Sequence, residues 1–91
     1  MQFILICEDK ADSEALRKAN RDAHLAYIGD FDVLFAGPML SDDGSTMIGS
    51  VICVEAEDRA AVDAFAAGDP YQTAGLFQTV TIRPFKRVIS G

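Results

Sequence analysis

The chain has 91 residues, of which 49% are hydrophobic, so it is long enough for one domain and too apolar to be globally disordered. Its formal net charge of −6 argues against a nucleic acid or an anionic membrane surface as a partner. No apolar stretch approaches the ~20 residues that a membrane helix needs. We also expect no secretory signal, because no basic segment precedes an apolar run and a cleavage site.

The two cysteines, Cys7 and Cys53, lie inside apolar runs, which is typical of buried, unpaired thiols. Because a disulfide scaffold needs more cysteines and a secretory context, we expect a reducing, cytoplasmic environment. The single histidine and the scattered acids form no transition-metal ligand set, and the glycines form no phosphate-binding pattern. The sequence therefore predicts neither a metal nor another cofactor.

The first predicted strand is the apolar run of residues 2–8, which is rich in β-forming residues and has polar ends. Asp12 or Ser13 is suited to the N-cap of the helix that follows. We expect this helix to continue to about Ile28, where Gly29 is placed to end it.

A second strand is predicted over residues 31–39, with Pro38 near its end or on an edge of the sheet. Residues 41–44, Ser-Asp-Asp-Gly, are a strong turn signal. Residues 46–56 indicate a third strand, so the second and third strands should form a hairpin.

Asp58 is predicted to cap a second helix over residues 59–67. The Gly-Asp-Pro run at 68–70 should end this helix, and residues 71–76 should form a short loop or a helical turn. Residues 77–85 alternate between apolar and polar types, as a last strand would.

The order strand–helix–strand–strand–helix–strand predicts an α+β fold of the ferredoxin-like βαββαβ type, with one antiparallel four-stranded sheet and both helices on one face. A solvated second face should alternate apolar and polar residues. The runs 3–7, 33–36 and 51–54 are instead apolar without a break. We therefore expect a homodimer that packs sheet against sheet, as a closed barrel, and not a monomer with ordinary exposed apolar surface.

His24 is the single histidine, and its position on the first predicted helix lies between a polar stripe and an apolar stripe. An imidazole titrates near neutral pH, so modest neighbours can make it a general base or acid. From spacing alone, a surface or half-buried helical histidine with no role is the more ordinary interpretation.

Asp69 stands just after the second predicted helix and before a proline, which is typical of a turn or capping aspartate. Because both helices lie on one face, it can also approach His24 and orient the imidazole ring. Ser50 follows Gly49 inside an apolar strand. Such a pair indicates that a ligand, a helix or a partner subunit packs closely there.

Other charged groups are expected to be solvated. The acidic pairs Glu8/Asp9 and Asp42/Asp43 are assigned to turns. A basic group near the C-terminus is interpreted as a solvated end, with a clamp for an anionic substrate as the alternative; it consists of Arg83, Lys86 and Arg87.

Five short motifs appear in register along the chain. They are Ala23-His24-Leu25, Ala36-Gly37-Pro38-Met39, Gly49-Ser50, Asp69-Pro70-Tyr71 followed by Ala74-Gly75, and Pro84-Phe85-Lys86-Arg87. The set resembles the YciI-like (YCII-related) family of small bacterial proteins, over essentially the whole chain, 1–91, as one domain.

The resemblance implies a dimeric α+β barrel of the ferredoxin-like type. It also implies that the family's histidine and aspartate map onto His24 and Asp69, facing a pocket between helices and sheet, and that Ser50 matches the family's Gly-Ser position. A similar domain serves a dehydrochlorinase of a chlorinated hydroxyquinol, and the same superfamily fold holds muconolactone isomerase. The predicted hairpin loop, residues 40–46, is shorter than in longer members, so a loop that covers the pocket is curtailed.

Two functions follow from these residues and the resemblance. The first is a cofactor-independent lyase or isomerase acting on a small cyclic or phenolic substrate, with His24 as general base and Asp69 holding its tautomer. In this hypothesis Arg21 or Tyr71 binds a substrate anion, and Ser50 also contacts the substrate. The alternative is a non-catalytic dimer that binds a small ligand or serves as an accessory module.

Overall fold

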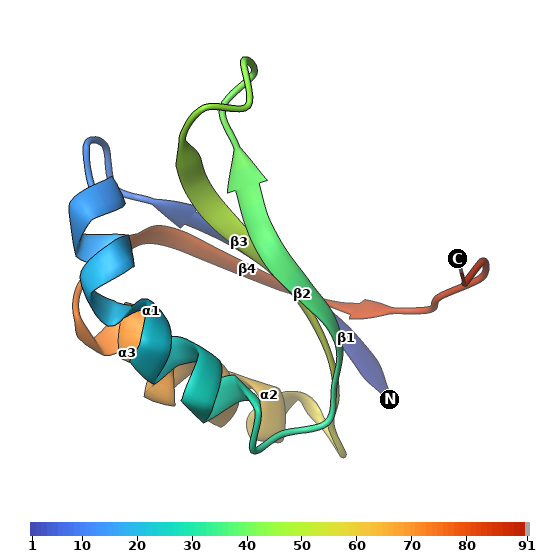
Figure 1. The fold of residues 1–91 in the computed structure, drawn as a ribbon. Coiled ribbons are helices and arrows are strands. Elements are labelled where there is room, and N and C mark those ends of the chain that lie inside the picture. The colour runs from blue at the N-terminus through green and yellow to red at the C-terminus, as the bar shows by residue number, and fades with distance from the viewer. Residues whose placement is uncertain (91) are drawn as a thin grey trace.

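The computed structural model describes residues 1–90 and shows one antiparallel sheet with helices on one face (Figure 1). The elements are β1 (Gln2–Asp9), α1 (Glu14–Ile28), β2 (Val33–Leu40), β3 (Met47–Glu55), α2 (Arg59–Gly68), α3 (Pro70–Thr73) and β4 (Phe77–Phe85). The strand order β2-β3-β1-β4 places β1 in the centre, between β3 and β4. The predicted ferredoxin-like α+β fold is confirmed.

The helix starts differ in how they are capped. Asp58 caps α2 as predicted, since its Oδ1 accepts the N–H of Ala61 at 2.9 Å. Ser13 is the N-cap residue of α1, but its side chain makes no capping hydrogen bond and donates instead to the carbonyl of Ala11 at 3.2 Å. Gly29 keeps a right-handed helical φ of −65°. The helix thus ends at Ile28 with Gly29 as its C-cap residue, as predicted, and does so without a left-handed glycine.

The second strand begins two residues later than the sequence predicted. Phe31 still donates its N–H to the carbonyl of Ile28 at 3.1 Å, and its ring packs edge-on against Phe65 with centroids 4.7 Å apart. Both contacts hold Phe31 against the helices, so β2 starts at Val33. Pro38 lies on an edge strand, as expected, where a missing N–H breaks no ladder on the free side.

The core lies between the helices and the inner face of the sheet. Alternate residues of β1, namely Phe3, Leu5 and Cys7, point into it and are almost fully buried. The pairing of β1 with β3 places Ile52 opposite Leu5, and helix α2 adds Phe65. Both cysteines are buried and free, as the sequence predicted.

The opposite side of the sheet is apolar over three strands. We call it the outer face; it is formed by Ile4, Ile6, Phe35, Met39, Val51 and Cys53, as the strand pairing requires. No helix covers this face (Figure 1). Apolar residues thus occupy both faces of β1 and β3, which is what the continuous apolar runs indicated.

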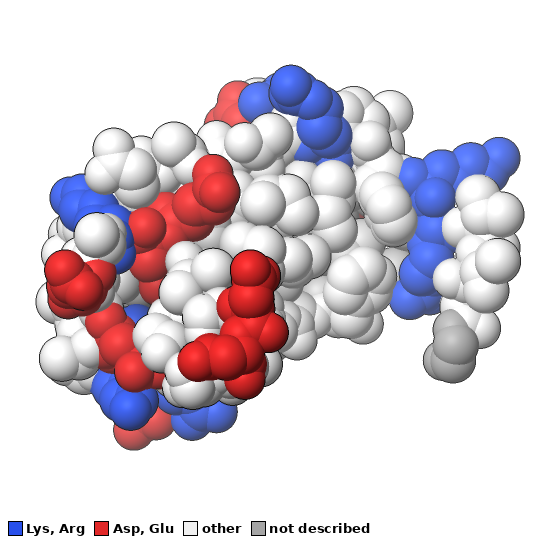
Figure 2. Space-filling model, turned by 90° about the horizontal axis from the view of Figure 1, so that it is seen from above, with Lys and Arg blue, Asp and Glu red and all other residues white. Residues whose placement is uncertain are grey.

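Charges are distributed unevenly along the molecule. In Figure 2 the acidic side chains gather, with basic ones among them, at the end that holds the start of α1 and the β2–β3 hairpin, whereas only basic side chains are seen at the end from which the C-terminal segment leaves the sheet. The exposed Arg83, Lys86 and Arg87 belong to the basic end. Within residues 1–90, no helix has both the length and the apolar character to cross a membrane.

Candidate active site

The side chains of His24 and Asp69, which are 45 positions apart, meet in the interior of the protein. Nδ1 of His24 lies 2.8 Å from Oδ1 and 3.0 Å from Oδ2 of Asp69. The two residues are only 5% and 2% exposed. Because a carboxylate oxygen accepts hydrogen bonds, Nδ1 of His24 is the donor in this contact, and in a neutral imidazole the lone pair then lies on Nε2.

The short helix α3 holds Asp69 in place. Asp69 is its N-cap residue, and Oδ1 accepts the N–H of Tyr71 at 2.9 Å. The Tyr71 ring stacks on the imidazole of His24 with centroids 4.0 Å apart and an interplanar angle of 11°. The sequence left two alternatives for Asp69, a turn or cap residue and a partner of His24. In the structure Asp69 has both roles.

A cavity of about 230 Å³ opens beside His24, between α1 and strands β2 and β3. Three residues named from the sequence line it together with His24: Arg21, Ser50 and Tyr71. Arg21 is exposed and, among residues 1–90, forms no ion pair. The basic residues near the C-terminus do not line this cavity, so they form no clamp for its contents.

Tyr71 presents a neutral phenol to the cavity. Burial raises the pKa of the Tyr71 phenol, and the positive charges of Arg17 and Arg21 only partly oppose that effect. The hydroxyl therefore keeps its proton at neutral pH and can donate a hydrogen bond.

Sequence reasoning missed a second buried pair, Asp9 and Arg17. Nε and Nη2 of Arg17 donate to the two carboxylate oxygens of Asp9 at 2.7 and 3.0 Å, and both side chains are 3% exposed. The prediction that Asp9 is a solvated turn residue is therefore wrong. β1 continues through Asp9, and its end meets the first turns of α1. One signal was available: Arg17 lies seven residues, two helical turns, before His24 and so shares its face of α1.

Arg17 joins this pair to the rest of the site. Its Nη2 donates to Oγ of Ser50 at 2.8 Å, and its guanidinium lies 4.7 Å from the centre of the Tyr71 ring. Burial disfavours the charged guanidinium, but the hydrogen bond and the charge of Asp9 outweigh it and raise the pKa of Arg17. Arg17 therefore stays charged beside the cavity.

The two residues of the Gly49-Ser50 pair contact different parts of the protein. Ser50 faces the helices, where Arg17 binds it. Gly49 faces the other way, and a Cβ at this position would clash with the carbonyl oxygen of Cys7 and lie 2.5 Å from Cε of Met39. The close neighbours of Gly49 among the described residues are thus strand β1 and a side chain of β2. The helix that the sequence offered as a neighbour of the pair is α1, which contacts Ser50 through Arg17.

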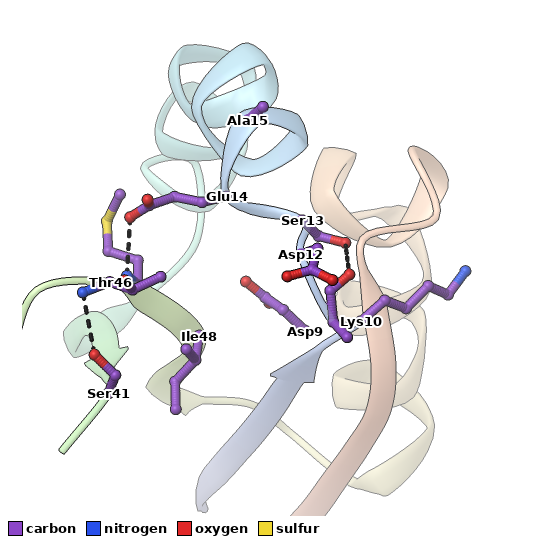
Figure 3. Close-up of a pocket in the computed structure, with 11 residues that line it drawn as sticks. Asp9, Lys10, Asp12, Ser13, Glu14, Ala15, Ser41, Thr46 and Ile48 are labelled. Atoms are coloured by element: carbon purple, nitrogen blue, oxygen red, sulfur yellow. Dashed lines mark hydrogen bonds between the residues drawn. The ribbon is translucent and has the colours of Figure 1, made fainter.

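A second, more open hollow of about 530 Å³ lies at the start of α1, against the hairpin (Figure 3). Glu14 crosses it and accepts the N–H of Met47 at 3.0 Å. Met47 lines both hollows, but the larger one contains neither His24 nor Asp69. In the described chain, no group of three His, Cys, Asp or Glu side chains is arranged to hold a metal ion.

Comparison with known proteins shows where the chain belongs. The family described as YCII-related domain matches residues 1–86. The chain belongs to the YCII-related family. The resemblance drawn from the five motifs is thereby confirmed.

Bacterial proteins are similar in sequence to this YCII-related chain. Protein YciI of Escherichia coli is 36% identical to it over 97% of this chain and 99% of its own length. An uncharacterised protein of Haemophilus influenzae is 30% identical over the same shares. Among solved structures, 5-chloro-2-hydroxyhydroquinone dehydrochlorinase (TftG) of Burkholderia phenoliruptrix AC1100, in complex with 2,5-dihydroxybenzoquinone, is similar with a TM-score of 0.87 and 33% identity over 94% of each chain.

Proposed function

We propose that this YCII-related protein is a cofactor-independent lyase or isomerase that acts on a small hydroxylated ring. One observation carries the proposal. The buried His24–Asp69 pair fixes the imidazole with Nδ1 bound and Nε2 without a partner among residues 1–90, at the wall of a cavity. This is the arrangement of a general base whose tautomer and orientation are held by a carboxylate.

The size of the cavity supports a single-ring substrate. A cavity of about 150 Å³ holds benzene, and pockets for larger, drug-sized ligands begin at about 300 Å³. The cavity beside His24, about 230 Å³, lies between these values. TftG, which shares this fold and 33% of its residues, acts on a chlorinated hydroxyhydroquinone. A ring with several oxygen substituents is therefore the substrate class that we assign.

In the proposed reaction, Nε2 of His24 takes a proton from a ring hydroxyl or an acidic ring C–H. The electron pair of the broken bond passes into the ring and gives an enolate or phenolate. Asp69 offsets the positive charge that develops on the imidazole. Return of the proton to a ring carbon gives a keto tautomer and completes an isomerisation. Where that carbon bears chlorine, loss of a second hydroxyl proton forms a new ring C=C bond as chloride leaves with the C–Cl bonding pair, which gives a quinone and a net loss of HCl.

The test is a turnover assay with 5-chloro-2-hydroxyhydroquinone as the first substrate of a panel of hydroxylated rings. A positioned base contributes ~10²–10⁴-fold, so His24→Ala should lower kcat by at least ~100-fold while the protein stays folded. Asp69→Asn should also lower kcat, because an amide can donate to Nδ1 and move the imidazole proton to Nε2. The nitrogen chemical shifts of His24 report that change of tautomer directly.

An unaltered kcat in His24→Ala would contradict the proposed base. Wild-type protein that binds ring compounds but turns over no member of the panel would favour the alternative, a non-catalytic ligand-binding module. Asp22→Ala, on an exposed position of α1 outside the cavity, serves as the control for nonspecific effects of changing this helix.

A further inference from the structure

The Arg17 side chain makes more contacts than are needed to hold α1 in the fold. Asp9 engages the edge of the guanidinium formed by Nε and Nη2. Ser50 accepts a further hydrogen bond from Nη2, and the Tyr71 ring lies beneath the guanidinium plane at 4.7 Å. The end of β1, strand β3 and helix α3 thus fix the orientation of one cation, which lies at the wall of the cavity.

The remaining edge of the guanidinium is free. Nη1 of Arg17 lies within ordinary hydrogen-bond distance and angle of no residue in the range 1–90, whereas Nε and Nη2 are both engaged. The Tyr71 hydroxyl is a near neighbour of the guanidinium that contributes to the raised pKa of Arg17. Within the same range, Oε1 of Gln2 is the one buried side-chain polar atom without a partner. Nη1 is therefore not sealed inside protein. Since Arg17 is otherwise 3% exposed and lines the cavity, Nη1 is the part that reaches it.

We propose that Arg17, positioned by Asp9, binds the anionic oxygen of the ring substrate through Nη1, and that the substrate enters this site as an ionised hydroxyquinone or phenol. This inference rests on the proposed function and names the charge state of its substrate. The two hydrogen bonds to Asp9 offset much of the desolvation cost of burying the guanidinium. Arg17 still presents fixed N–H donors, which act on a developing negative charge as an oxyanion hole does.

Arg21 has a different role in this arrangement. It also lines the cavity, but it is exposed and carries no ion-pair partner among the described residues. An exposed charge attracts an anion at a distance and is screened by salt. The buried Arg17 works in a lower dielectric and at a fixed position. We therefore assign discrimination between ionised and neutral rings to Arg17, and attraction of the anion to Arg21.

The test measures binding and not turnover. 2,5-dihydroxybenzoquinone is the anionic probe, since its hydroxyl groups ionise at neutral pH, and hydroquinone is the neutral probe of similar size. Removing Arg17 alone leaves the buried Asp9 carboxylate without its partner and endangers folding. The variant is therefore the double substitution Asp9→Asn with Arg17→Gln, which replaces the ion pair by an uncharged, hydrogen-bonding pair. Arg59→Gln with Asp63→Asn is the matched control, because Arg59 and Asp63 form an ion pair of 2.8 Å on the exposed surface of α2.

We expect the Asp9/Arg17 variant, checked for folding by circular dichroism, to bind the anionic probe at least ~10-fold more weakly than wild type, as loss of a hydrogen bond to a charged group implies. Binding of hydroquinone should change by less than ~2-fold, and the Arg59/Asp63 control should bind both probes as wild type does. Arg17→Lys keeps the charge but loses the planar fork, so it should recover only part of the preference for the anion.

Three results would overturn the inference. One is unchanged affinity of the double variant for the anionic probe. Another is an equal loss of affinity for both probes, which would indicate a structural role alone. The third is a wild-type protein with no preference for the anion. The His24→Ala variant should still bind the anionic probe. It therefore distinguishes a failure of the Arg17 inference from a failure of the proposed reaction. If the Arg17 inference holds and His24→Ala retains turnover, then the proposed base is wrong and the anion site stands.

Discussion

The pKa of the Cys7 thiol is strongly altered by the protein interior. Burial, reinforced by the nearby negative charge of Asp69, raises the pKa of the Cys7 thiol from 9.0 to about 12. The unfolded chain therefore releases this proton about three pH units before the folded chain does. Between pH 9 and 12 the unfolded state binds fewer protons, so the free energy of unfolding falls as pH rises, by up to roughly 1.4 kcal/mol per pH unit.

We predict that urea unfolding between pH 8 and pH 11 shows this loss of stability, and that Cys7→Ala removes much of the slope although it lowers stability near neutral pH. Cys53→Ala, which removes the thiol on the outer face, is the matched control; burial also raises the pKa of this thiol, but by less, so the variant should keep more of the slope than Cys7→Ala. At pH 8 the native Cys7 thiol should also resist a thiol reagent that labels the unfolded chain, since the thiolate is the reacting species. Equal slopes in wild type and Cys7→Ala would contradict the assignment.

At the scale of elements, the packing of β3 against β1 depends on position 49 being a glycine, which has no side chain. A Cβ at Gly49 would clash with the backbone carbonyl of Cys7, which cannot move without breaking the ladder between the two strands. Gly37, on the neighbouring strand β2, has nothing within 4 Å of the same position. Two glycines on one face of the sheet therefore differ in the space around them.

We predict that Gly49→Ala destabilises the protein by about 1–3 kcal/mol, as overpacking of a tight site does. Gly37→Ala should change the free energy of unfolding by no more than about 0.5 kcal/mol, because neither steric conflict nor a positive φ opposes it. Thermal and urea unfolding of the two variants at equal protein concentration measures the difference. Equal destabilisation would show that the contact with Cys7 is not the cause.

At the scale of the whole molecule, the outer face and the C-terminal segment leave apolar side chains in water. Phe35 on the outer face is 41% exposed, and Val88 and Ile89 in the segment after β4 are 83% and 86% exposed. That segment extends away from the body of the molecule (Figure 1). Contiguous exposed apolar surface of this kind favours association, and the sheet offers one flat face for it.

We predict a homodimer that packs sheet against sheet. Sedimentation at micromolar concentration should give twice the mass of the chain, and Phe35→Lys should shift the equilibrium towards monomer because it places a charge in the apolar contact. Leu16→Lys, an equally exposed apolar position on α1 and away from the outer face, should leave the mass unchanged. A wild-type monomer at this concentration would refute the dimer.

Local sequence signals predicted the fold well because they act over a few residues. The periodicity of apolar residues located all four strands and both long helices, and Asp58 was recognised as a cap that the structure then showed. The errors in the fold arose where distant segments decide the outcome. Phe31 was assigned to a strand, and the aromatic contact with Phe65 keeps it out of β2.

The candidate site was predictable in part. His24 stood out as the single histidine, and Asp69 as an acid at the end of a helix on the same face of the sheet. Asp9 was assigned to solvent and Arg17 was not given a role, because no local pattern shows that the end of β1 lies against α1. Burial of a charge depends on a partner from elsewhere in the chain.

By itself, the sequence determined the order of elements, the apolar character of both sheet faces, and the presence of a single histidine. These follow from side-chain chemistry and short-range periodicity. Only the tertiary structure decided that Asp69 binds Nδ1 of His24, that Asp9 holds Arg17, and that Gly49 adjoins strand β1. Each of these depends on the packing of residues between 8 and 45 positions apart, and the register of strands and helices fixes such contacts to within a few tenths of an ångström.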